Sequence, residues 1–260
     1  MYNKSTYIRN RFRQIIFIFL IGCSICIAAR GDLISTEILA TRNVINTQTY
    51  IEEELAQIVT DMFSIEPAQY GYWMYKITYE TIDIHGNPHY ATGTVSYPRV
   101  DWPDVPDQAF PIMSYQHGTV VEKSDVTSVI GEWILPAILT GAGYVYVEPD
   151  YLGLGDSEGM HPYQLKEPYG TAVVDMLRAV RYYASFENEQ FVVNDQLFLA
   201  GYSEGGYAMS DVDALRLELK GRAELLIGDI GAIEKLSDVF DPTVPLGFAS
   251  VDVDLYSSTM

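Results

Sequence analysis

The pattern of hydrophobic and polar positions changes character part-way along the chain. Residues 49–63 place apolar side chains at helical spacing, which predicts an amphipathic helix. Residues 72–84 and 89–97 are rich in β-branched and aromatic side chains and are separated by a Gly-Asn-Pro turn, so they predict two strands joined in a hairpin. Residues 101–111 contain three prolines, which predicts a loop.

After residue 111, short apolar runs of strand length alternate with longer runs at helical spacing. This alternation predicts an α/β fold with a mostly parallel central sheet and helices on both faces. Ligands bind at the carboxyl ends of the strands in such sheets. The predicted strands are 112–115, 144–147 and 197–200, and the predicted helices are 133–140, 169–186 and a run from Gly206 to about Lys220.

The strand at 197–200 leads directly into the stretch Gly-Tyr-Ser-Glu-Gly-Gly at 201–206, and a helix is predicted after it. A strand, a sharp turn and a helix form the context in which G-x-S-x-G is typical of a nucleophile elbow. The serine is held at strained backbone angles where strand and helix nearly touch, so Gly201 and Gly205 are needed because they lack bulky side chains. Ser203 is therefore the candidate nucleophile.

A second stretch, Gly-Asp-Ser-Glu-Gly at 155–159, also matches the pattern. A chance match somewhere in a chain of this composition is expected about one time in ten. Ser157 follows a glycine-rich loop and precedes Met160-His161-Pro162, where no helix can start cleanly. Ser157 is therefore interpreted as a loop residue.

The loop after the strand at 112–115 is the candidate for a second part of the site. A tetrahedral intermediate carries negative charge on one oxygen, which two backbone N–H groups stabilise. In this architecture one N–H comes from the residue after the nucleophile, here Glu204, and the other from this earlier loop. Gly118 would let the backbone approach and Thr119 would supply the N–H, whereas the alternative is that His117-Gly118 only ends the strand. We expect the Glu204 side chain to be exposed beside the nucleophile.

No base for Ser203 is evident. All four histidines precede it, whereas the usual order for this elbow is serine, acid, histidine. His117 would lie on the oxyanion side, so a structural role is expected for it, and His85, His89 and His161 are expected to be surface or packing residues. None forms a metal-ligand spacing with another histidine or a cysteine, so neither a metal nor a cofactor is predicted.

The first 28 residues predict an export signal. Four basic residues precede an apolar core at 15–27, which is too short for a comfortable transmembrane helix. Cys26-Ile27-Ala28 offers a cleavage site of small residues. The stretch ending at Cys23 also resembles a bacterial lipoprotein signal, which would make Cys23 a lipidated N-terminus, and an uncleaved anchor is the third interpretation.

Composition indicates a globular body after this signal. Apolar residues make up 48% of the chain, and both cysteines lie in the signal, so the body has no disulfide framework. The formal charge of −19 becomes −23 once the four basic residues of the signal are removed, which makes nucleic acid and anionic lipid poor partners. Residues 29–47 show weak periodicity and predict a leader arm, and residues 48–260 predict one domain.

Four motifs occur in a fixed order: Gln116-His117-Gly118-Thr119, the run Pro-Asp-Tyr-Leu-Gly-Leu-Gly at 149–155, His161-Pro162-Tyr163 and the elbow. Together they resemble the α/β-hydrolase secretory lipase family, including the fungal lipase A type and its bacterial relatives. The resemblance covers about residues 70–220. It implies hydrolysis of carboxylic esters, with Ser203 as nucleophile and the backbone N–H groups of Thr119 and Glu204 as oxyanion donors.

In that family the acid and the histidine lie on later loops, usually well over a hundred residues further on, whereas 57 residues follow Ser203 here. The resemblance therefore implies a partial domain at 48–260 that lacks the last strands and the cap. The nucleotide sequence beyond codon 260 would show whether the frame continues.

Two functions of different classes follow from the sequence. The first is an exported, truncated or frameshifted hydrolase of small-molecule or lipid esters that forms an acyl-enzyme at Ser203 and has little turnover because it lacks the base. The second is a non-catalytic exported binding protein on the same scaffold. A third outcome is a chain that does not fold stably, because the sheet would expose an unpaired edge.

Overall fold

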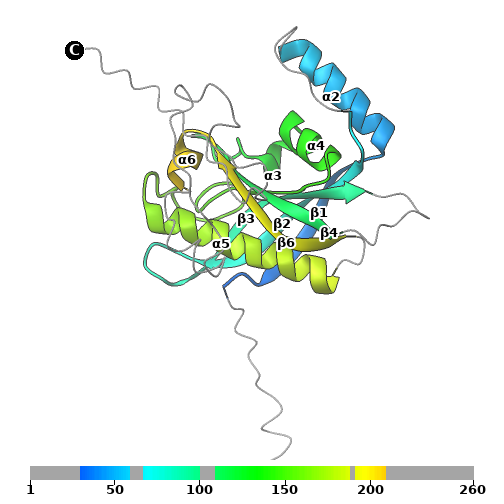
Figure 1. Ribbon diagram of the computed structural model, residues 1–260. Coiled ribbons are helices and arrows are strands. Elements are labelled where there is room, and N and C mark those ends of the chain that lie inside the picture. The colour runs from blue at the N-terminus through cyan, green and yellow to red at the C-terminus, as the bar shows by residue number, and fades with distance from the viewer. Residues whose placement is uncertain (1–29, 59–66, 100–108, 188–190, 209–260) are drawn as a thin grey trace, which may run out of the picture.

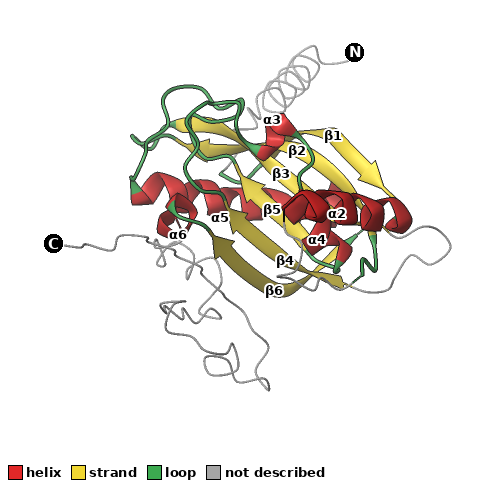
Figure 2. Cartoon of the chain, turned by 90° about the horizontal axis from the view of Figure 1, so that it is seen from above, coloured by secondary structure: helices red, strands yellow, loops and turns green. Residues whose placement is uncertain are grey.

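The structure is a computed structural model, and it describes residues 30–58, 67–99, 109–187 and 191–208. The predicted signal at 1–28 with Cys23 and Cys26, and the predicted helix beyond residue 208, lie outside the described residues. A six-stranded sheet in the order β1-β2-β3-β5-β4-β6 forms the centre of the described part, with helices on both faces (Figure 1, Figure 2).

The elements follow the chain in a simple order. The strands are β1 (Leu33–Arg42), β2 (Gly71–Ile82), β3 (Pro88–Arg99), β4 (Ala109–Gln116), β5 (Val145–Pro149) and β6 (Val192–Gly201). The helices are α2 (Val44–Ile58), α3 (Thr127–Ile130), α4 (Ile134–Gly141), α5 (Lys166–Tyr182), the π-helix η1 (Tyr183–Glu187) and α6 (Glu204–Ala208).

Strand pairing confirms the predicted α/β class. The pairs β1/β2, β2/β3 and β3/β5 are antiparallel, and the pairs β5/β4 and β4/β6 are parallel. It follows that β2, β5, β4 and β6 run in one direction and that β1 and β3 run in the other. The predicted hairpin is formed by β2 and β3, which pair from Gly71↔Arg99 to Ile82↔Pro88.

The order of the strands brings the carboxyl ends of three strands together at one end of the sheet. The chain passes from β4 to β5 through α3 and α4, and then returns from β5 past β4 to β6 through α5. Crossovers between parallel strands are right-handed, so two crossovers in opposite directions place their helices on opposite faces. Helix α5 indeed covers one face, and α2 and α4 cover the other (Figure 1, Figure 2). The carboxyl ends of β4, β5 and β6 meet where the crossover direction reverses, which is where such folds form ligand sites.

Helix α5 carries much of the core. Its apolar positions recur at spacings of three and four residues, and Ala172, Val173, Met176, Leu177 and Val180 are all buried. Met176 lies against Gly93 of β3, where an added Cβ would be 2.6 Å from the methionine sulfur. Burial of this apolar stripe is the main contribution that holds the helix on the sheet.

The segment 29–47, expected as a leader arm, contains β1 and the start of α2. β1 is antiparallel to β2 at the edge of the sheet, from Leu33↔Tyr79 to Arg42↔Tyr72. Most of its side chains are exposed or half-buried, so the strand has little apolar alternation that the sequence could reveal. Other boundaries differ too: β4 begins at Ala109 inside the expected loop, and α3 was not predicted.

The buried carboxylate of Asp175, in α5, forms an ion pair with Arg30 at the start of the described residues. Asp175 is fully buried and accepts hydrogen bonds from Arg30 Nε at 3.1 Å, Arg178 at 2.7 Å and the hydroxyl of Thr81 at 2.9 Å. The two arginine side chains are 43% and 40% exposed, so both keep contact with water. Asp175 thus links the segment before β1, strand β2 and helix α5.

Candidate functional site

Ser203 lies in the tight turn between β6 and α6, and its backbone has a φ of +53°. This left-handed conformation is uncommon for a residue other than glycine and is found where surrounding structure holds strain in place. The Ser203 side chain is exposed. Strand, strained serine and helix together form the geometry that the sequence predicted for a nucleophile elbow.

The elbow packs directly on the end of β4. Tyr202 N–H donates to the carbonyl oxygen of Gln116 at 3.2 Å. A Cβ on Gly205 would lie 1.9 Å from the same oxygen, and a Cβ on Gly201 would lie 2.6 Å from the Gly205 carbonyl carbon. Both flanking glycines are therefore required by backbone contacts.

The loop after β4 lies against the elbow. A Cβ on Gly118 would be 2.8 Å from the Tyr202 ring, so Gly118 permits the close approach that the sequence predicted. The next residue, Thr119, is exposed, and its hydroxyl lies near enough to the Glu204 carboxylate to help lower the pKa of that group. The fold thus brings together the two residues predicted to supply oxyanion donors, Thr119 and Glu204.

The expectation that the Glu204 side chain is exposed is wrong. Glu204 is 6% exposed, and its Oε1 accepts hydrogen bonds from His161 Nε2 at 2.7 Å and from the Tyr169 hydroxyl. As the first residue of α6, Glu204 turns its side chain beneath the loop that follows β5 and toward α5. The partners come from elsewhere in the chain, and a motif six residues long contains no information about them.

His161 is more than a packing residue. Its Nδ1 donates to the carbonyl oxygen of Leu152 at 2.8 Å, and its Nε2 faces the Glu204 carboxylate. Burial lowers the pKa of His161, but the hydrogen bonds to Glu204 and Leu152 and the charge of Glu204 outweigh burial and raise the pKa above its usual 6.5. Burial raises the pKa of Glu204, but hydrogen bonds from His161 and Tyr169 and the histidine charge bring the pKa below its usual 4.5.

Sequence reasoning missed this pair. The one local signal at this position is the motif His161-Pro162-Tyr163, to which the sequence alone assigned no role. An ion pair between residues 43 positions apart depends on which loops the sheet order brings to one edge.

Of the other three histidines, two have partners elsewhere and the third is exposed in a turn. His117 Nδ1 lies 2.7 Å from the carbonyl oxygen of Gly118, and its Nε2 lies 3.3 Å from that of Asp150. His89 Nε2 contacts the Ser157 hydroxyl at 3.2 Å, and His85 is exposed in the hairpin turn. In the described part of the chain, which includes all four histidines, no imidazole hydrogen-bonds to the Ser203 hydroxyl.

Ser157, in the rival motif, lies in the loop between β5 and α5 and is 1% exposed. Its hydroxyl accepts a hydrogen bond from Gly153 N–H at 3.1 Å. A buried hydroxyl held in this way is not open to a substrate carbonyl, in contrast to that of Ser203.

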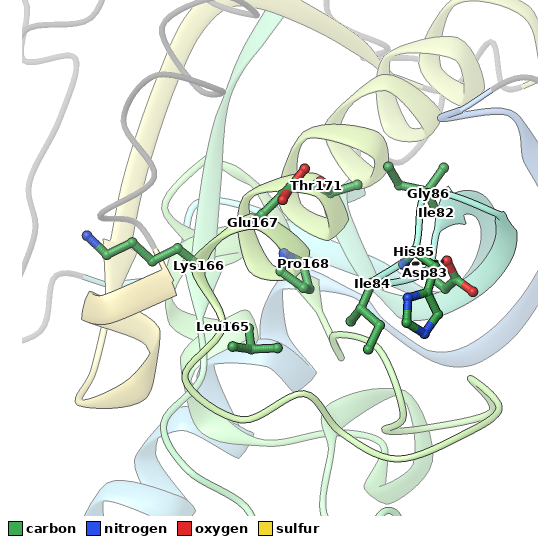
Figure 3. Close-up of a pocket in the computed structure, with 10 residues that line it drawn as sticks. All are labelled: Ile82, Asp83, Ile84, His85, Gly86, Leu165, Lys166, Glu167, Pro168 and Thr171. Atoms are coloured by element: carbon green, nitrogen blue, oxygen red, sulfur yellow. Dashed lines mark hydrogen bonds between the residues drawn. The ribbon is translucent and has the colours of Figure 1, made fainter.

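The described residues contain no group of three histidine, cysteine or acidic side chains placed to hold a metal ion. A cavity of about 430 Å³ lies between the turn of the β2–β3 hairpin and the start of α5, lined by residues such as Ile82, Asp83, Leu165 and Pro168 (Figure 3). None of the residues predicted for the site lines this cavity. The candidate site is the open surface around Ser203, at the carboxyl ends of β4 and β6.

Solved structures share the fold, although no family model and no curated protein matches the chain. A protein of Legionella pneumophila, itself only provisionally assigned as a hydrolase, is 33% identical over 72% of this chain, with a TM-score of 0.59. The rice cell wall degrading esterase LipA of Xanthomonas oryzae is 26% identical over 74% of this chain, also with a TM-score of 0.59.

The chain has the α/β-hydrolase fold, in common with these hydrolases and esterases. The matched region of the chain spans about half of each relative, 48% in both cases. Lipase A of Candida antarctica also matches, at 19% identity and a TM-score of 0.45. A likeness so distant does not bear on the narrower resemblance to secretory lipases, which stays a prediction.

None of the described helices is long and apolar enough to cross a membrane. The apolar run at 15–27 lies outside them.

Proposed function

We propose that this protein is a serine hydrolase of carboxylic esters, with Ser203 as the nucleophile and the backbone N–H groups of Glu204 and Thr119 as oxyanion donors. The observation that carries the proposal is the positive φ of Ser203 at an exposed turn whose flanking glycines pack on the end of β4. Structure of this kind presents a hydroxyl group to a bound substrate. The esterase LipA, which shares the fold, supports an ester as the substrate class.

In the proposed reaction the Ser203 hydroxyl attacks the ester carbonyl and its proton passes to a base. The tetrahedral oxyanion is held by the two N–H groups, the alcohol leaves, and water hydrolyses the acyl-enzyme. Because none of the four imidazoles within these 260 residues hydrogen-bonds to the Ser203 hydroxyl, no imidazole is positioned here to accept its proton. We therefore expect little turnover from this chain by itself.

Export belongs to the same proposal. The basic region and apolar core within residues 1–28 support a signal that directs the protein out of the cytoplasm, with lipidation at Cys23 as the alternative to cleavage after Ala28. Attachment to a membrane, if present, would then occur through this N-terminal segment.

An irreversible active-site reagent tests the proposal without requiring turnover. The purified chain is incubated with a fluorophosphonate, and the adduct is followed by intact mass and located by peptide mapping. We expect one adduct on Ser203 that accumulates over hours, no adduct in Ser203→Ala, and unchanged labelling in Ser157→Ala, the matched serine of the rival motif. Hydrolysis of p-nitrophenyl esters should be close to background.

A second candidate function is a non-catalytic binding protein that keeps the hydrolase scaffold. It is favoured by the engagement of three of the four histidines, His89, His117 and His161, with groups other than the Ser203 hydroxyl. A folded chain that shows no fluorophosphonate adduct would support this function and refute the hydrolase. Rapid ester hydrolysis that Ser203→Ala abolishes would instead show that a base has been overlooked.

A further inference from the structure

One carboxylate lies where two loops and helix α5 meet at the candidate site. Glu204 accepts hydrogen bonds from His161 in the loop after β5 and from Tyr169 in α5. The Thr119 hydroxyl, in the loop after β4, lies near enough to help lower the pKa of Glu204. These four residues form what we call the Glu204 cluster. Two of its members, Glu204 and Thr119, are the residues whose backbone N–H groups would form the oxyanion hole.

The members of the Glu204 cluster are held from outside it as well. Tyr169 accepts a hydrogen bond from Gln164 N–H at 3.2 Å, and His161 donates to the Leu152 carbonyl at 2.8 Å. The Thr119 hydroxyl lies 3.5 Å from the Tyr163 hydroxyl. A carboxylate fixed on so many sides leaves residue 204 little freedom to rotate.

Charge strengthens the contact with His161. The Glu204 side chain is 2% exposed and that of His161 is 13% exposed, so water screens the pair poorly. The other titratable groups that face the pair are phenols from two segments, Tyr151 and Tyr163 in the loop between β5 and α5 and Tyr169 in α5. Burial raises the pKa of Tyr151 and of Tyr169 above the usual 10, so these two stay neutral while the pair is charged.

We infer that His161, Glu204 and Tyr169 are positioning residues, which hold the Thr119 and Glu204 N–H groups in register to form the oxyanion hole. The side chain of Glu204 lies inside the fold while its N–H, at the first position of α6, has no acceptor within the helix. The loop that carries Thr119 lies against the same structure, because its Gly118 packs on Tyr202 and the Thr119 hydroxyl lies near the Glu204 carboxylate and 3.5 Å from the Tyr163 hydroxyl. This inference rests on the proposed function and adds a role to residues that never touch the substrate.

The role of the pair depends on pH. The folded pKa of His161 is raised, so its contribution is complete below the usual 6.5 and is lost as the pH rises through the folded value. The folded pKa of Glu204 is lowered, so its contribution is complete above the usual 4.5 and is lost as the pH falls through the folded value. Positioning by the charged pair is therefore complete between these two values.

The test compares the rate of fluorophosphonate labelling at Ser203 in the 260-residue chain with the rates in Glu204→Gln, His161→Ala and His161→Gln. Because misplacement of a reacting group by about 1 Å, or loss of one oxyanion donor, costs about 100-fold, we expect Glu204→Gln and His161→Ala to label about 10- to 100-fold more slowly. His161→Gln, whose amide can still donate to Glu204, should recover part of the rate. The ratio of wild-type to His161→Ala rates should be largest between pH 4.5 and 6.5.

Asp175→Asn is the matched control, because it removes the charge of another buried carboxylate remote from the elbow. It should lower stability but leave the labelling rate of the folded protein unchanged. If the Glu204 cluster only stabilised the fold, its variants would behave in the same way, with a rate ratio independent of pH, and the inference would be overturned.

A second measurement separates this inference from the proposed function. In Ser203→Ala, which cannot be labelled, the ¹⁵N–¹H resonances of Thr119 and Glu204 should both titrate with His161, and His161→Ala should abolish that titration. If neither amide responds to the protonation of His161, the inference fails even when Ser203 labels normally. If both respond but the wild type never labels, the hydrolase proposal fails and the positioning role stands.

Discussion

Replacement of Gly205 by alanine tests whether contact with β4 is what places Ser203. The added Cβ would lie 1.9 Å from the Gln116 oxygen, 2.5 Å from the Gln116 carbonyl carbon and 2.8 Å from the His117 oxygen. All three are backbone atoms of the β4 end, so no side chain can swing aside. Ordinary contact begins at 3.4 Å, and the difference from 1.9 Å means that the elbow and β4 must move apart by about 1.5 Å.

That movement has two measurable consequences. Overpacking of this kind costs about 1–3 kcal/mol of stability, which urea unfolding would measure. It also separates the oxyanion loop from the elbow, and a misplacement of about 1 Å costs about 100-fold in rate. We therefore expect Gly205→Ala to label with fluorophosphonate at least about 100-fold more slowly than the wild type.

Gly86→Ala is the matched control. Nothing lies within 4 Å of the position of its Cβ, although its φ of +81° also disfavours alanine. We expect a loss of about 1–2 kcal/mol from backbone strain and an unchanged labelling rate. If Gly205→Ala were as stable as the wild type and labelled at the same rate, the idea that close packing on β4 positions Ser203 would be refuted.

Two further predictions concern how the N-terminal segment is attached to the fold and how it is processed. Asp175→Ala should lower the free energy of unfolding by about 2–3 kcal/mol in urea unfolding. The loss is smaller than for a fully buried ion pair because both arginines can rehydrate. Replacement of the exposed Glu122 by alanine, the control, should change the free energy of unfolding by less than about 0.5 kcal/mol. In an exporting bacterial host, mass spectrometry should find a mature chain that begins at Ala29; an acylated N-terminus at Cys23 would establish the lipoprotein interpretation, and an intact Met1 with retention in the cytoplasm would contradict export.

Local patterns in the sequence predicted most of the elements correctly. The hairpin of β2 and β3, helix α5 and the strand that enters the elbow have apolar periodicities set by their own backbone geometry. Elements without such a stripe were missed. β1 is an edge strand with mostly exposed side chains, and α3 is a single turn.

The histidines show the limit of such reasoning. A histidine in a loop has no periodicity, so the sequence could not distinguish His85 in an exposed turn from His161 under the elbow. His161 pairs with Glu204 because the order of strands in the sheet brings the loops after β4 and β5 to the same end of the sheet as α6.

By itself, the sequence determined the elbow. A strand, a serine and two glycines within six residues dictate a sharp turn, because the steric limits on that turn are local to the backbone. Only the tertiary structure decided what lies around Ser203. Glu204 was expected to be exposed, but it is buried against His161 and Tyr169, which are 43 and 35 residues away in the sequence. The order of the strands determines which loops and helices surround this carboxylate, and a local motif contains no information about that order.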